Sequence, residues 1–154
     1  MGLPSDLTSK HAKLDANISL MRGHLEAVRS ASSDGLDPSA LEKIQPWTEQ
    51  IGEMLHGYLD DERDDILQQA GRVLGEGLEE ISEINDHSDE LLERFDHFAS
   101  ALDEMGAGLD SHQIDELRDH FEEFIACFER HRDAERNFYS LYSTILFPSG
   151  AATD

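Results

Sequence analysis

The stretch that decides the fold is SHQIDELRDHFEEFIACFERHRDAERNFYSLYSTILF (residues 111–147). Its apolar side chains recur mostly every three or four residues, which is the spacing of one face of an α-helix rather than of a strand. These side chains are Leu117, Phe121, Phe124, Phe128, Phe138, Tyr142 and Ile145. Pro148 follows and cannot continue a helix, because it lacks an amide hydrogen. We therefore expect one long helix over residues 111–147.

Three segments before this stretch show the same periodicity. They predict helices over residues 5–32, 46–70 and 78–105, with a short helical piece between residues 38 and 45. Asp37 and Pro38 have the residue types of an N-cap and a first helical position. Pro46 is expected to start or kink the second main helix. Glycines then loosen the next two connections, at Gly71, Gly75 and Gly77 and at Gly106 and Gly108.

These helices predict an all-α fold. No segment alternates in the manner of a strand, and 154 residues fit one domain. Short connections make neighbouring helices antiparallel. The sequence therefore predicts an up-down-up-down antiparallel four-helix bundle over residues 1–148, followed by a frayed tail over residues 149–154.

The charge and composition exclude several classes of function. The chain has 34 acidic and 12 basic residues, a net charge of −22, which disfavours contact with the phosphates of nucleic acids. No apolar run approaches the roughly 20 residues of a membrane helix, and the first residues lack a signal-peptide pattern. Cys127 is the only cysteine, which excludes an internal disulfide and a cysteine-based metal site. We expect a cytoplasmic protein that binds neither nucleic acid nor membrane.

Four of the eight histidines interrupt the apolar stripes, one on each predicted helix. His11 lies between Leu7 and Leu14, and His87 between Ile84 and Leu91. The other two are His56 and His131. One histidine on each helix of an antiparallel bundle can meet the other three at one level of the core. The remaining four histidines flank the stripes or lie near a helix start, and we expect surface or boundary positions for them.

Two carboxylates accompany these histidines. Asp60 follows His56, and Glu135 follows His131, each at a distance of four residues, so each pair shares a helix face. An ionised carboxylate in a core is costly unless it has partners or a metal. Imidazole and carboxylate together suit iron, manganese or zinc. The sequence therefore predicts a metal site formed by six residues: His11, His56, Asp60, His87, His131 and Glu135.

The spacing alone is weak support in so acidic a chain, because His11 and His112 also have an acid four residues later. The prediction depends instead on ligands placed within apolar stripes. Asp15 and Glu83 are secondary candidates for ligands, although a solvated acid is the simpler interpretation of Glu83. Tyrosines could donate hydrogen bonds to the site, and Cys127 is interpreted as a small packing residue. The tyrosines are Tyr58, Tyr139 and Tyr142.

The order of these ligands resembles the hemerythrin-like cation-binding domain family. The motifs are His56-Gly57-Tyr58-Leu59-Asp60 and His131-Arg132-Asp133-Ala134-Glu135, with single histidines at His11 and His87. The resemblance covers nearly the whole chain and implies a four-helix bundle with two iron ions. It implies that His11 and His56 serve one iron, that His87 and His131 serve the other, and that Asp60, Glu135 and an oxo or hydroxo group bridge the pair.

The chain departs from the family in three ways, one of which is that the last motif has four residues to Glu135 where the oxygen-carrying members have five residues to an Asp. Asp60 stands where the family usually has Glu, and Glu83 stands where the oxygen-carrying members have a fifth histidine. The sequence is therefore more similar to the four-histidine branch, whose members act in stress response, iron handling and sensing.

Four hypotheses for function follow. A binding module would sense or scavenge oxygen, nitric oxide or peroxide at the iron pair. An enzyme would break down peroxide or reduce nitric oxide there. An iron-handling protein would donate iron to a partner, as in repair of iron–sulfur clusters. A metal-free interaction bundle would merely bury its histidines. Manganese or zinc could replace iron, and the sequence leaves the oligomeric state open.

Overall fold

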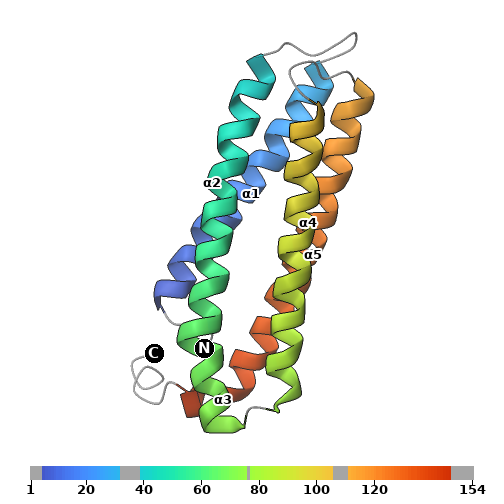
Figure 1. Ribbon diagram of the computed structural model, residues 1–154. Coiled ribbons are helices and arrows are strands. Elements are labelled where there is room, and N and C mark those ends of the chain that lie inside the picture. The colour runs from blue at the N-terminus through green and yellow to red at the C-terminus, as the bar shows by residue number, and fades with distance from the viewer. Residues whose placement is uncertain (1–4, 32–38, 76, 106–110, 147–154) are drawn as a thin grey trace.

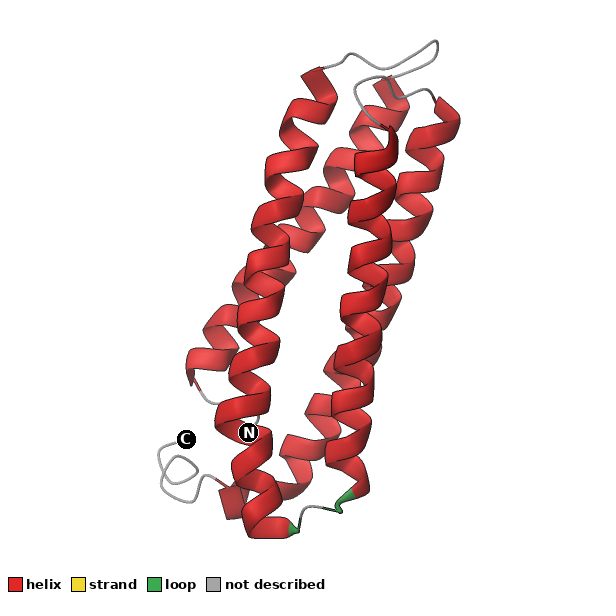
Figure 2. Cartoon of the chain, in the orientation of Figure 1, coloured by secondary structure: helices red, strands yellow, loops and turns green. Residues whose placement is uncertain are grey.

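The structure is a computed structural model that describes residues 5–31, 39–75, 77–105 and 111–146. Almost all of these residues are helical, and none of them forms a strand (Figure 2). The prediction of an all-α fold is confirmed. The expected cap at Asp37 and Pro38, the glycines at 106 and 108, and the tail over residues 149–154 lie outside the described residues. The elements in chain order are α1 (Ser5–Ala31), α2 (Ser39–Asp61), η1 (Glu62–Leu67), α3 (Gln68–Leu74), α4 (Glu79–Met105) and α5 (Ser111–Leu146).

The second helical rod is longer than the sequence predicts. Elements α2, η1 and α3 follow one another without an intervening loop, and η1 has the wider turn of a π-helix. The rod already begins at Ser39, so the prediction that Pro46 starts this helix is wrong, and Pro46 lies within α2. The rod also continues past Ala70 to Leu74, where Gly75 ends it with a φ of 114°. A positive φ of this kind favours glycine, which has no side chain to clash with the backbone.

Four helical rods lie side by side (Figure 1), and buried apolar residues from all four form one core between them. Helix α1 contacts α2 and α5, and α4 also contacts α2 and α5. Aromatic rings fill the seam between α4 and α5: the Phe98 and Phe121 centroids are 4.9 Å apart, and those of Phe95 and Phe124 are 5.2 Å apart. These tilted and edge-on contacts are the favourable geometries for aromatic pairs. The seam fixes α5, which carries most of the site described below, against α4.

Exposed ion pairs join α1 to α5 on the outside of the bundle. Arg22 lies 2.6 Å from Glu122, Arg29 lies 2.7 Å from Asp115, and Arg118 lies 2.7 Å from Glu26. Pairs this exposed contribute at most about 1 kcal/mol each, so they align the two helices more than they stabilise them. None of the described helices combines the length and the apolar character needed to cross a bilayer.

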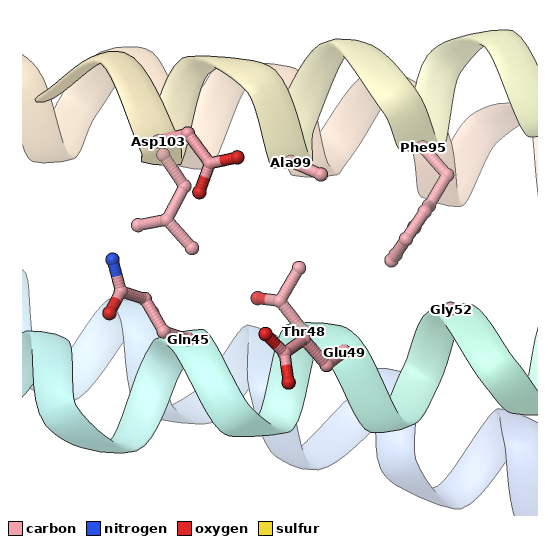
Figure 3. Close-up of a pocket in the computed structure, with 8 residues that line it drawn as sticks. Gln45, Thr48, Glu49, Gly52, Phe95, Ala99 and Asp103 are labelled. Carbon is pink, nitrogen blue, oxygen red and sulfur yellow. The ribbon is translucent and has the colours of Figure 1, made fainter.

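A hollow of about 270 Å³ separates residues 45–52, in the middle of α2, from α4. Phe95 points from α4 toward Gly52 on α2, and Thr48 lies between them and Asp103 (Figure 3). A Cβ atom at Gly52 would lie only 3.1 Å from the Phe95 ring, so this glycine lets the ring approach α2. Thr48 and Glu62 are fourteen positions apart, which is roughly 20 Å along a helix. The hollow is therefore separate from the candidate site.

Candidate metal site

Three potential metal ligands meet inside the bundle. The helix segments that carry them lie in the half of the bundle nearer α3 (Figure 1). Glu62 comes from the start of η1, and His131 and Glu135 come from α5. His131 Nε2 lies 3.0 Å from Glu62 Oε1 and 3.5 Å from Glu135 Oε2. One ligand atom from each residue lies within 4.8 Å of the other two, and all three residues are at most 2% exposed. This buried group could hold a metal ion.

Local helix geometry explains how these side chains converge. His131 and Glu135 are one turn apart on α5, so both point to the same side of that helix. Glu62 follows Leu55 and Leu59 on the buried face of α2, at intervals of seven and three residues. The π-turn that begins at Glu62 also brings Ile66 and Leu67 to the interior. Single π-turns within α-helices are frequent at functional sites.

Two buried tyrosines hold the two carboxylates from the facing helix. The Tyr58 hydroxyl donates a hydrogen bond to Glu135 Oε2. The Tyr139 hydroxyl donates to Glu62 Oε2 over 3.3 Å. Both phenols are fully buried. The expectation that these two tyrosines could donate to the site agrees with the structure. Tyr142 instead packs against Phe138 at the edge of the core, with ring centroids 5.2 Å apart.

Burial and mutual contact shift the proton equilibria of the cluster. Burial, together with the neighbouring Glu135 carboxylate, raises the pKa of Glu62 to about 8. Burial alone would lower the pKa of His131, but the hydrogen bonds and charges of Glu135 and Glu62 raise it to about 9. Burial would raise the pKa of Glu135, yet its contacts with Glu62, His131 and Tyr58 hold it below its usual value. Without metal at neutral pH, His131 and Glu135 therefore carry opposite charges that cancel, while Glu62 keeps its proton and is uncharged.

These pKa values predict that the metal-free protein loses stability as pH rises. Glu62 and His131 have folded-state pKa values of about 8 and about 9, above their ordinary values of 4.5 and 6.5. Each therefore stabilises the fold below its ordinary pKa and loses that contribution as pH rises through the folded-state pKa. Urea denaturation from about pH 6 to about pH 9 should show a falling free energy of unfolding. Glu62→Gln, which cannot lose a proton, should flatten the decline, and an equal decline in that variant would contradict this account.

The chemistry and the unpaired polar atoms of the cluster are suited to a metal ion. Glu135 Oε1 and His131 Nδ1 are buried and have no hydrogen-bond partner among the described residues. A buried polar atom without a partner is costly, so such atoms call for an explanation. Imidazole nitrogen and carboxylate oxygen are ordinary ligands of iron, manganese and zinc. Glu135 Oε1 in particular is an open oxygen that an ion in this group could use.

Of the six residues predicted as ligands, the structure brings His131 and Glu135 together and places His11 nearby. The half-buried His11 ring stacks on Phe128, with centroids 5.2 Å apart, and meets the Tyr58 ring edge-on at 5.5 Å. Burial lowers the pKa of His11, and the nearby Glu135 charge opposes that shift. His11 therefore lies at the margin of the cluster.

The other three predicted ligands lie apart from the cluster. His56 and Asp60 are exposed, and Asp60 is 3.9 Å from Arg63, so the expectation that both face the core is wrong. The face of α2 that does point inward is one residue away from His56, at Leu55. His87 is half-buried, and its Nε2 lies 3.9 Å from Glu83 Oε1. Among the secondary candidates, Asp15 lies 3.6 Å from Arg132.

Glu62 was not among the predicted ligands because no histidine precedes it by one helical turn, whereas Asp60 and Glu135 each follow a histidine by four residues. A different signal was present in the sequence. Tyr58 and Glu62 are four residues apart, and Glu62 lies three residues after Leu59 and four before Ile66. An acid at such a position on an apolar stripe is the same kind of costly placement as Glu135.

Comparison with models of protein families, with curated proteins and with solved structures finds no match to this chain.

Proposed function

We propose that this protein is a metal-binding helical bundle in which Glu62, His131 and Glu135 hold a transition-metal ion. The observation that carries the proposal is the buried convergence of two carboxylates and one imidazole, with Glu135 Oε1 left without a hydrogen-bond partner among the described residues. A divalent ion would balance the charge of both carboxylates when His131 is neutral. That balance is the arrangement in which a buried group of this kind is least costly.

We propose that the ion is iron and that the bundle is of the hemerythrin-like kind. His131 and Glu135 match the last motif of that family in sequence. The second carboxylate of the cluster, Glu62, stands two residues after Asp60, which the resemblance implies as the bridge. Three protein ligands are enough to hold one ion, so the geometry favours one iron per chain. The two-iron centre is the alternative form, and it requires His11 and further ligands to move into the cluster.

We also propose that the four helical rods follow the up-down-up-down order. The ion pairs between α1 and α5 support it, because Arg22 pairs with Glu122 while Arg29, later in α1, pairs with Asp115, earlier in α5. The two tyrosine–glutamate hydrogen bonds indicate that the second rod and α5 are parallel. Tyr58 pairs with Glu135, and Glu62, later in the second rod, pairs with Tyr139, later in α5. In an up-down-up-down bundle, two parallel helices lie diagonally opposite each other. Their side chains would meet only along the central axis of the bundle, which is where the site lies.

The ligand of the ion is proposed to be a small molecule such as oxygen, nitric oxide or peroxide. An iron ion held by three protein ligands keeps open positions that such a molecule can occupy. The half-buried His11 ring, which stacks on Phe128 and meets Tyr58 edge-on, lies at the margin of the cluster and would line the approach. Sensing, scavenging and stress response are the roles that this chemistry suits.

Metal analysis of protein purified without an affinity tag, after growth in iron-rich medium, tests the proposal. We expect about one iron per chain, bound with a coordination set typical of imidazole and carboxylate. About two irons per chain would favour the two-iron form instead. Protein that is folded but free of iron, manganese and zinc would contradict the proposal and leave a polar network that merely holds the helices together.

The small-molecule ligand needs a separate experiment. Nitric oxide added anaerobically to the ferrous protein should change its visible absorption. The same addition to His131→Ala, which removes a ligand of the ion, should produce no change. Identical spectra with and without nitric oxide in the iron-loaded protein would contradict the proposed ligand class while leaving the metal site intact.

A further inference from the structure

We infer that Tyr58 and Tyr139 restrict each carboxylate of the cluster to a single ligand oxygen, so that the site selects small transition-metal ions over calcium. The inference rests on the proposed metal site and adds the residues that determine which ions it accepts. It starts from the hydrogen bonds of the two carboxylates, which use one oxygen of each group.

Each carboxylate has one oxygen that accepts a phenol hydroxyl and one oxygen that no phenol occupies. Glu135 Oε2 accepts the Tyr58 hydroxyl and also lies 3.5 Å from His131 Nε2, whereas Glu135 Oε1 has no hydrogen-bond partner among the described residues. Glu62 Oε2 accepts the Tyr139 hydroxyl, and Glu62 Oε1 faces His131 Nε2 at 3.0 Å. The donor atoms available to an ion are therefore one oxygen from each glutamate and one imidazole nitrogen.

The phenols are held firmly enough to enforce this division. Both tyrosines are fully buried, and neither hydroxyl can turn to solvent. The Tyr139 ring meets Phe138 edge-on with centroids 5.2 Å apart, and the Tyr58 ring meets His11 in the same way at 5.5 Å. The pairing is also reciprocal, because each of the two helical rods contributes one tyrosine and one glutamate. A rotation of either carboxylate toward two-oxygen binding would break a buried hydrogen bond.

Ion preference follows from the number of oxygens. Calcium takes six to eight oxygen ligands and commonly binds carboxylates through both oxygens. Zinc-like ions are satisfied by about four ligands, of which imidazole nitrogen is a preferred type. With one oxygen from each glutamate, the cluster supplies too few oxygens for calcium but enough donors for a small transition-metal ion, with solvent completing the set. The tyrosines act as positioning residues, since they touch the ligands and not the ion.

Competitive binding of two metals tests the inference. Cobalt(II) reports transition-metal binding through its visible absorption, and calcium binding is measured by isothermal titration calorimetry at fixed ionic strength. The variants are Tyr58→Phe, Tyr139→Phe and the double variant, and the matched control is Tyr142→Phe, whose half-buried ring packs against Phe138. Removal of outer contacts of this kind typically changes metal affinity by about 10- to 100-fold. We expect the ratio of cobalt to calcium affinity to fall at least about tenfold in the double variant.

The cobalt spectrum should change as well, toward the weaker absorption of a higher coordination number, while Tyr142→Phe keeps the original spectrum and ratio. Wild-type protein that binds no cobalt would overturn the proposed function itself. Wild-type protein that binds cobalt, together with tyrosine variants that keep its ratio and spectrum, would overturn only the inference. If circular dichroism shows that the double variant is unfolded, the two single variants decide by the same ratio.

Discussion

Glu62→Gln should weaken transition-metal binding by at least about a hundredfold, since loss of a ligand exceeds the 10- to 100-fold typical of losing an outer contact. The substitution keeps the size of the side chain and its place on the buried face of η1, but it removes the charge that faces His131 at 3.0 Å. His131→Ala should have an effect of at least the same size. Isothermal titration calorimetry with zinc or ferrous iron measures both.

Matched controls come from the motif that the sequence favoured. His56→Ala and Asp60→Asn remove the exposed histidine and acid on the same rod, and both should leave the affinity within about twofold, as expected for surface changes. These variants distinguish ligands on the buried face of the rod from ligands on its exposed face. If His56→Ala or Asp60→Asn abolished binding while Glu62→Gln did not, the ligands would be those of the sequence motif, and the geometry described here would be wrong for the metal-bound protein.

Metal binding should also raise the thermal stability of the protein. At a free metal concentration one hundred times the dissociation constant, linkage predicts about 2.7 kcal/mol of added stability. For a domain of this size the melting temperature should rise by roughly 5–10 °C. Differential scanning calorimetry with and without zinc measures this shift. His131→Ala should show none, because it lacks the imidazole that faces both carboxylates.

The net charge of −22 requires a control in this experiment, since any cation can stabilise so acidic a surface by screening. Scans in about 0.5 M sodium chloride remove most of that general effect, because the screening length is then only a few ångströms. An equal shift produced by magnesium, or an equal shift in His131→Ala, would mean that the stabilisation comes from the surface and not from the cluster.

Much of the fold could be predicted because its signals are local. The apolar stripe over residues 111–147 and its counterparts predict helices whose bounds differ little from α1, α4 and α5. The second rod was harder to predict. Pro46 suggested a helix start, yet proline is tolerated within the helix. The π-turn from Glu62 to Leu67 has no clear sequence signature and changes which residues face inward beyond it.

The site was only half predictable for a related reason. His131 and Glu135 lie on one uninterrupted α-helix, so their spacing correctly places both side chains on the same buried side. On α2, the same spacing selected His56 and Asp60, which lie on the exposed side of the helix. Glu62 is stabilised in the interior by His131 and Tyr139, the latter 77 positions later in the chain. Contacts between residues so far apart appear only when the rods are packed together.

The most direct test of the metal site is a crystal structure of metal-loaded protein, with diffraction measured on both sides of the absorption edge of the bound metal. We expect an anomalous peak within bonding distance of Glu62 Oε1, His131 Nε2 and an oxygen of Glu135, about 2.0–2.2 Å from each atom. A strong peak beside His56 and Asp60 would contradict the proposed site. So would a crystal of metal-saturated protein that shows no peak among Glu62, His131 and Glu135.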